Sequence, residues 1–201
     1  KWKKAKGIGI FSMATGSGKT LTALTLVTRV SKKYKPLVVI IVCPFLNLCH
    51  QWEKELLKFG ITPISCFDKR VNWDSKLDRG YQRLKAGIIE ILTIVTTNAT
   101  YMGEIFQAKL KSRVTDGGLH HLLIADEVHN LGRPQFINNP TDFFDYRLGL
   151  SATPDRQYDE EGTDELFNYF GNKKNTTEKN SPVFIFELKD AMDVGVLVPY
   201  D

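Results

Sequence analysis

The stretch FSMATGSGKT, residues 11–20, constrains the fold more than any other part of the sequence. It puts two glycines, Gly16 and Gly18, directly between an apolar segment at 8–13 and a helical pattern at 20–32. Glycine adopts backbone angles that other residues avoid, so this turn can direct successive N–H groups toward an anion. The positive end of the following helix dipole adds to that attraction. The stretch therefore predicts a strand, a phosphate-binding turn and a helix, in this order.

Two side chains at the end of the turn suit a nucleoside triphosphate and its metal ion. The Lys19 ammonium can reach the β- and γ-phosphates, and the Thr20 hydroxyl can ligate Mg²⁺. The pattern G-x-x-x-x-G-K-[ST] is incomplete, because Met13 stands where its first glycine is expected. The position between strand and helix nevertheless favours nucleotide binding over a chance glycine turn.

Short apolar segments alternate with helical patterns along the chain. Residues 37–42 are apolar at every position, as in a central parallel strand covered on both faces. The repetition predicts an α/β fold with a doubly wound, mostly parallel sheet, right-handed crossovers and helices on both faces. The length of 201 residues suits a single domain, 1–201. Further strand-like segments lie at 63–67, 91–96, 121–126, 146–151 and 183–188, a short helix follows at 189–195, and a polar, mobile surface loop is expected at 172–182.

Two helices have apolar stripes that should face the sheet. In the helix at 20–32 we expect the inward residues to be Leu21, Leu24 and Val27. In the helix at 45–59 the stripe consists of Leu48, Trp52, Leu56 and Phe59. We favour a core position for Trp52 over a role in stacking on nucleic-acid bases.

The segment HLLIADEVHNLG carries two adjacent carboxylates at the end of an apolar strand. Open α/β sheets bind ligands at the carboxyl ends of their strands. Asp126 can hold Mg²⁺ there, and Glu127 beside it can polarise an attacking water molecule. In a chain that also has a phosphate loop, this pair favours hydrolysis of the nucleotide over transfer to a metabolite.

Together, MATGSGKT, DEVH and LGLSATP resemble motifs I, II and III of the superfamily 2 DEAD/DEAH-type helicases and translocases. In that family a methionine often precedes ATGSGKT, which accounts for Met13. CPFLNLCHQW is similar to motif Ia and TTNATY to the Ib region, so the resemblance extends from the first strand to about residue 154. It implies the first RecA-like lobe of a P-loop NTPase, most similar to type III restriction (Res) subunits and XPB-like DNA helicases.

The resemblance also implies roles for individual residues. Asp126 and Thr20 would bind Mg²⁺. Lys19 would contact the phosphates, and Glu127 would activate the attacking water molecule. The residues linking the nucleotide to the nucleic-acid side would be His129, Ser151 and Thr153. The triphosphate would be bound by Thr15, Gly16, Ser17, Gly18, Lys19 and Thr20, and one nucleic-acid strand by Pro44, Asn47, Gln51, Thr97 and Asn98.

The function implied is ATP-dependent movement on DNA in a restriction, repair or defence system, with ATP and Mg²⁺ as ligands. An RNA helicase lobe is less favoured because DEVH stands where RNA helicases have DEAD. A nucleotide-gated binding module without motor activity stays open, although such a switch could dispense with Glu127. A small-molecule kinase has no use for LGLSATP.

The resemblance covers one lobe, so we expect a second RecA-like lobe in the same chain to follow residues 188–201. That lobe would supply arginines that stabilise the transferring phosphoryl group, and the isolated lobe should hydrolyse ATP barely, if at all. A methyltransferase or nuclease subunit is a possible further partner.

The cysteine content and the lengths of the apolar runs indicate in which compartment the protein is expected and whether it enters a membrane. The longest apolar run is too short to cross a bilayer, so no membrane association is expected. The three cysteines lack a C-x-x-C spacing and suit reduced, buried thiols in the cytoplasm. The net charge of +4 permits contact with a polyanion without demonstrating it.

Overall fold

The structure of the protein is a computed structural model that describes residues 2–114, 117–131, 141–154, 159–171 and 182–196. Its elements in chain order are β1 (Ile8–Met13), α1 (Lys19–Ser31), β2 (Leu37–Cys43), α2 (Leu46–Lys58), β3 (Ile64–Cys66), α3 (Arg70–Lys85), β4 (Ile91–Thr97), α4 (Asn98–Met102), α5 (Glu104–Val114), β5 (His120–Ala125), the 3₁₀ turn η1 (Val128–Asn130), β6 (Tyr146–Ser151), α7 (Glu160–Phe170), β7 (Phe184–Phe186) and α8 (Leu188–Asp193).

The strands form one seven-stranded sheet in the order β3-β4-β2-β5-β6-β1-β7. Every strand pairing in this sheet is parallel. Strand β2 lies between β4 and β5, and each of its residues is buried. This central position explains why residues 37–42 are apolar without alternation. The expected doubly wound sheet is confirmed, and the described part of it is parallel throughout.

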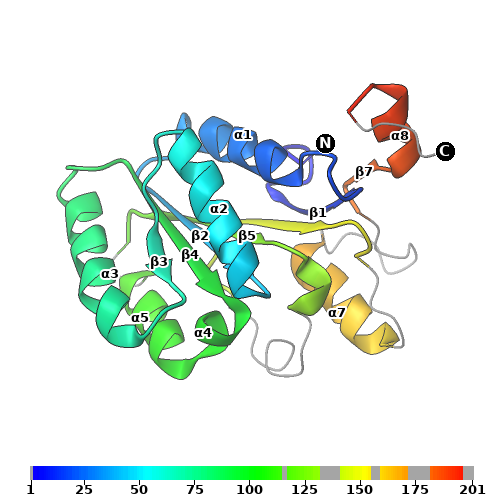
Figure 1. Cartoon of the computed structure of the whole chain (residues 1–201). Helices are drawn as coiled ribbons and strands as arrows, with labels where there is room; N and C mark the ends of the chain where they lie inside the picture. Colours follow the sequence, from blue (N-terminus) through cyan, green and yellow to red (C-terminus); the bar gives the residue numbers. More distant parts are fainter. Residues whose placement is uncertain (1, 115–116, 132–140, 155–158, 172–181, 197–201) are drawn as a thin grey trace.

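Helices cover both faces of the sheet (Figure 1). Helices α1 and α2 pack on one face through Leu24, Val27, Trp52 and Leu56. Helices α3, α5 and α7 pack on the other face, together with the short α4. Their buried side chains on that face include Trp73, Leu77, Tyr81, Tyr101, Phe106, Leu110, Leu166 and Phe170. Helices on both faces were expected, and this expectation is confirmed.

Two residues expected on the inward stripes are exposed instead. Leu21 is 56% exposed, because it lies roughly 120° around α1 from the centre of the buried stripe at 100° per residue. Phe59 is 49% exposed, because α2 ends at Lys58 and Phe59 is the C-cap residue beyond it. The buried stripe of α1 consists of Ala23, Leu24, Val27, Val30 and Ser31. The predictions for these two residues were wrong at the ends of otherwise correct helices.

Since the strands are parallel, β1, β2, β4, β5 and β6 all end at the same edge of the sheet. We call this edge the carboxyl edge. The glycine turn follows β1, the DEVH segment follows β5, and the SAT segment begins with the last residue of β6. The parallel topology therefore gathers motifs that are more than 100 residues apart in sequence into one place, as happens at the ligand-binding edge of other open α/β sheets.

Several other expectations concern the rest of the chain. The three cysteines, Cys43, Cys49 and Cys66, are free and buried. The strand and helix expected near the end of the chain exist as β7 and α8. The loop expected at 172–182 lies, apart from residue 182, outside the described residues. Among the described helices, none has the length and apolar character needed to cross a membrane.

Candidate functional site

The glycine turn joins the end of β1 to the start of α1 in a conformation that requires glycine. Gly16 has φ of 78° and Gly18 has φ of 91°, both in the left-handed region. A side chain at Gly18 would meet no atom within 4 Å, so the space beside the turn at this point is open. The Ser17 hydroxyl donates to the Ala14 carbonyl at 2.6 Å and closes the turn from inside. The left-handed backbone predicted for Gly16 and Gly18 is thereby confirmed, as an anion-binding turn would require.

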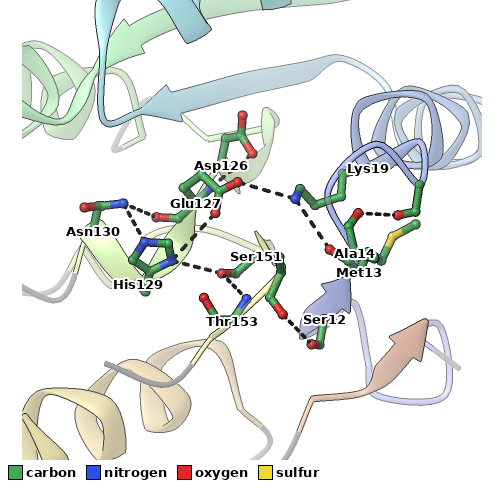
Figure 2. A network of polar contacts seen from close by, with 12 residues as sticks. Ser12, Met13, Ala14, Lys19, Asp126, Glu127, His129, Asn130, Ser151 and Thr153 are labelled. Carbon is green, nitrogen blue, oxygen red and sulfur yellow. Dashed lines mark hydrogen bonds and ion pairs between the residues drawn. The ribbon is translucent and has the colours of Figure 1, made fainter. Parts of the chain in front are cut away.

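Lys19 connects this turn to the DEVH segment (Figure 2). Its Nζ lies 3.4 Å from Oε1 of Glu127 and 3.4 Å from the carbonyl oxygen of Met13. The Lys19 side chain is only 12% exposed. The lysine and the carboxylate, predicted separately from two motifs, are thus direct neighbours at the carboxyl edge.

Asp126 and Glu127 adopt different backbone conformations directly after β5. The Asp126 N–H donates to the Val42 carbonyl at 2.8 Å and extends the strand pairing by one residue. Glu127 has φ of 44° and ψ of 57°, a left-handed conformation that costs a residue other than glycine about 1–3 kcal/mol. Its N–H donates to Oδ1 of Asp126 at 3.0 Å, and its carbonyl accepts from the Asn130 N–H at 2.9 Å. These contacts hold the strained residue and aim the Glu127 side chain at Lys19.

The Asp126 carboxylate is almost completely removed from solvent. It is 9% exposed, and its Oδ2 accepts a hydrogen bond of 2.8 Å from Nε1 of Trp52 on α2. Burial raises the pKa of Asp126, and the hydrogen bond from Trp52 opposes that rise. Carboxylate and hydroxyl oxygens are the donors that Mg²⁺ prefers, so Asp126, Glu127 and Thr20, the second residue of α1, fit that ion chemically.

His129 links the DEVH segment to the SAT segment. Its Nδ1 lies 2.9 Å from Oγ of Ser151, and its Nε2 lies 2.8 Å from the amide nitrogen of Asn130. An amide nitrogen can only donate, so Nε2 accepts and Nδ1 carries the proton donated to Ser151. The buried Ser151 Oγ also accepts from the Thr153 N–H at 3.1 Å. The three residues expected to link the nucleotide to the nucleic-acid side are joined in one chain of contacts (Figure 2).

The five residues expected to contact nucleic acid lie at or just after the ends of β2 and β4, at the same edge, but they differ in exposure and contacts. Asn47 and Gln51 are exposed on α2, and Pro44 is half-buried before it. Thr97 is the N-cap of α4 and accepts from the Thr100 N–H at 3.3 Å. The Asn98 amide donates to the Asn130 carbonyl at 3.2 Å. Hence Asn47 and Gln51 present free surface, whereas Thr97 and Asn98 use their side chains within the protein.

Two contributors to this site were missed from the sequence. Trp52 was assigned correctly to the core, where it is 1% exposed, but its polar partner Asp126 was not anticipated. Asn130 was not singled out, although it contacts His129, Glu127 and, through its carbonyl, Asn98. A buried tryptophan needs a partner for its N–H, and that rule alone gave reason to search for an acceptor near Trp52.

Known proteins match this chain over the segments that contain the candidate site residues. Residues 1–156 match the family described as "Type III restriction enzyme, res subunit". The DNA 3'-5' translocase XPB2 of Sulfurisphaera tokodaii is 30% identical over 173 residues, which are 83% of this chain and 30% of that protein. The putative DNA 3'-5' helicase Rad25 of Haloarcula marismortui is 26% identical over 166 residues, which are 83% of this chain and 23% of that protein. The chain thus spans less than a third of the length of these curated relatives.

Solved structures resemble the fold as well. The helicase domain of Hef from Pyrococcus furiosus superposes with a TM-score of 0.60 at 21% identity, over 86% of this chain and 36% of that one. At that identity the likeness concerns the fold, and it confirms the RecA-like arrangement expected from the motifs.

Proposed function

The chain belongs to the family of the type III restriction enzyme res subunit, and from this premise we propose that it is the ATP-binding lobe of an ATP-dependent DNA helicase or translocase. The contact between Lys19 and Glu127 carries the proposal, because it joins a phosphate-binding turn to a candidate water-activating carboxylate. A turn that merely bound an anion would not need that carboxylate, held in a strained backbone conformation, beside its lysine.

In this proposal the turn binds the triphosphate of ATP and Mg²⁺ supplies charge neutralisation on the phosphates. Backbone N–H groups of residues 15–19 and the Lys19 ammonium hold the phosphates, and the Thr20 hydroxyl and the Asp126 carboxylate hold the ion. Glu127 orients a water molecule for attack on the terminal phosphorus of ATP and takes a proton from it, while the bond from that phosphorus to the β–γ bridging oxygen breaks and ADP leaves. When ATP binds, the Lys19 ammonium moves from the Glu127 carboxylate to the phosphates. The carboxylate can then act as a base.

The coupling step runs from Glu127 through His129 to Ser151. His129 Nδ1 lies 3.7 Å from Oε2 of Glu127 and 2.9 Å from Oγ of Ser151. A movement of the Glu127 carboxylate therefore changes how the Nδ1 proton of His129 is shared between Glu127 and Ser151. Ser151 is the last residue of β6 and Thr153 follows it, and we propose that this end of β6 is linked to the binding of nucleic acid.

DNA is the proposed track because both curated relatives are named for action on DNA. Asn47 and Gln51 on the exposed side of α2 would contact the phosphate backbone, supported by Pro44. Amide side chains bind phosphates without reading bases, as a motor that moves along any sequence requires. Thr97 and Asn98 would act mainly through α4 and Asn130, since their side chains already have partners within the protein.

We further propose a second RecA-like lobe in the same chain that completes the ATP site, with a methyltransferase or nuclease subunit as a possible partner. The free, buried cysteines support a reducing compartment such as the cytoplasm.

The test is Mg-ATP hydrolysis by the full-length protein alone and with single-stranded DNA, duplex DNA or RNA. We expect stimulation by DNA, and Lys19→Ala should abolish it. Lys35→Ala is the matched control, because Lys35 pairs with Glu90 at 2.5 Å in front of β2, at the opposite edge of the sheet. Stimulation by RNA alone would favour an RNA helicase. Turnover indifferent to all three polymers would contradict the motor and favour a nucleotide-gated module.

A further inference from the structure

Two buried tryptophans in this protein donate hydrogen bonds to acceptors of different kinds. Trp73 on α3 donates to the backbone carbonyl of Asp68 at 3.2 Å, five residues away in sequence. Trp52 on α2 donates to the carboxylate of Asp126 at 2.8 Å, across 74 residues of sequence. The shorter distance is typical of a hydrogen bond to an ionised acceptor. The Trp52 bond thus joins an otherwise apolar helix face to the candidate metal ligand.

Packing alone does not account for a tryptophan at position 52. The side chain lies among apolar residues on the inward face of α2, next to Cys49 and Leu56, and is 1% exposed. A phenylalanine or leucine would contribute apolar surface there without requiring a polar partner. What the indole adds is one N–H group directed at Asp126.

The Asp126 carboxylate has one donor on each oxygen. Oδ2 accepts from Trp52, and Oδ1 accepts from the Glu127 N–H at 3.0 Å. Within the part of the chain that the structure describes, no cation forms an ion pair with Asp126, because Lys19 pairs with Glu127 instead. A carboxylate oxygen can accept more than one bond, so both oxygens keep capacity for a metal ion or its water ligands. Two donors at fixed points determine how the plane of the carboxylate is turned.

We propose that Trp52 is a positioning residue for the reaction, whose indole N–H fixes the Asp126 carboxylate in the orientation that receives the metal ion. The inference rests on the proposed role of Asp126 as a metal ligand. It also ties the metal site to α2, whose exposed side carries Asn47 and Gln51. A displacement of α2 on binding nucleic acid would therefore move the donor that holds the metal-binding carboxylate.

Loss of the indole N–H should weaken binding of the metal ion more than binding of the nucleotide. Without it, Oδ2 has no donor among the residues that the structure describes, and the carboxylate can turn toward Lys19 or solvent. Removing a group that orients a metal ligand typically weakens metal affinity or activity about 10- to 100-fold. Phosphate contacts of the glycine turn do not involve Trp52, so binding of the nucleotide without metal should stay the same.

The experiment compares Trp52→Phe with Trp73→Phe in the full-length protein. Each variant removes one buried indole and its hydrogen bond, but only Trp52 is near the candidate site. The first measurement is Mn²⁺ affinity in the presence of ADP, from the electron paramagnetic resonance signal of free Mn²⁺. The second is the Mg²⁺ concentration that gives half-maximal ATP hydrolysis. Thermal melting of both variants reports any loss of stability.

For Trp52→Phe we expect Mn²⁺ affinity to fall about 10-fold or more, with a similar rise in the Mg²⁺ requirement. The KM for ATP at saturating Mg²⁺ should change less than about twofold, because the phosphate contacts persist. Trp73→Phe should leave both metal measurements unchanged. Equal metal affinities for the wild type and Trp52→Phe would overturn the proposal.

If Trp52→Phe does not fold, the benzothienyl analogue of tryptophan at position 52 replaces only the N–H by sulfur and keeps the shape. It should reproduce the loss of Mn²⁺ affinity, and a normal affinity would overturn the proposal. The proposed motor function is judged separately by DNA stimulation of the wild type. A wild type without DNA stimulation whose Trp52 variant still loses Mn²⁺ would contradict the motor and keep this inference. A wild type that binds no Mn²⁺ with ADP would overturn both the metal site and the role of Trp52.

Discussion

Two aspartates in this molecule, Asp78 and Asp126, have hydrogen-bond donors of different kinds, cationic for the first and neutral for the second. Between α3 and α5, Asp78 accepts from Lys109 at 2.8 Å and from Arg113 at 2.9 Å, with its side chain 33% exposed. Those cationic partners hold the pKa of Asp78 below its usual range, Lys109 most strongly. At the carboxyl edge, Asp126 is buried, has an indole and a backbone N–H as donors, and has a raised pKa. Paired surface charges suit stability, whereas a buried carboxylate with neutral donors suits a ligand that brings its own positive charge.

The largest expected effect comes from Asp126→Asn in the full-length protein. Hydrolysis of ATP should fall at least about 1,000-fold, because the amide cannot neutralise a metal ion as the carboxylate does. The free energy of unfolding should change by less than about 1 kcal/mol, since the loss of one hydrogen bond is offset by removal of a buried charge. Steady-state kinetics and urea unfolding measure the two quantities. A variant that is much less stable but hydrolyses ATP normally where it is folded would show that Asp126 has mainly a structural role.

Glu127→Gln tests the second carboxylate of the site. Turnover should fall about 100- to 1,000-fold, as expected when a general base is removed, while ATP binding persists. Isothermal titration with ATP and a hydrolysis assay separate these outcomes. The control is Glu90→Gln, because Glu90 is 65% exposed and pairs with Lys35 instead of a site residue. Normal turnover in Glu127→Gln would contradict the assignment of the water-activating residue.

Asn130→Ala should have an intermediate effect. Its amide donates to Nε2 of His129, so removal frees the imidazole to adopt the other tautomer and weakens the link to Ser151. We expect DNA stimulation of hydrolysis to fall about 10-fold, with basal hydrolysis reduced less. Asn72→Ala on the exposed surface of α3 is the control. Unchanged stimulation would exclude Asn130 from the coupling.

The smallest effect is expected from Asp78→Asn, and it should appear in stability alone. Exposed ion pairs contribute little each, so the loss at neutral pH should be about 0.5–1 kcal/mol. Because the pKa of Asp78 is lowered in the folded state, its contribution is present above the unfolded pKa of about 4 and is lost as pH falls through the lower folded value. Unfolding of both proteins at pH 7 and pH 3 measures the difference, which should shrink at pH 3. Hydrolysis should be unchanged.

Much of the architecture could be predicted from the chain alone. The uninterrupted apolar run at 37–42 identified the central strand, and glycines at 16 and 18 identified the left-handed turn before α1. The errors were Leu21, which lies outside the angular range of the buried stripe on α1, and Phe59, which lies beyond the last residue of α2. Lys19, Asp126 and Glu127 could be proposed for a nucleotide site because each follows or precedes a recognisable element.

What the sequence by itself determined is the set of local elements and the chemical groups at the strand ends. Local backbone preferences and periodicity depend on neighbouring residues, so they can be recognised without the fold. Only the tertiary structure decided the partnerships: Lys19 with Glu127, Trp52 with Asp126, and Asn98 with Asn130. These contacts join residues between 32 and 108 positions apart. They exist because parallel strands bring their carboxyl ends to one edge, where the packing of α1, α2 and α4 against the sheet fixes which groups meet.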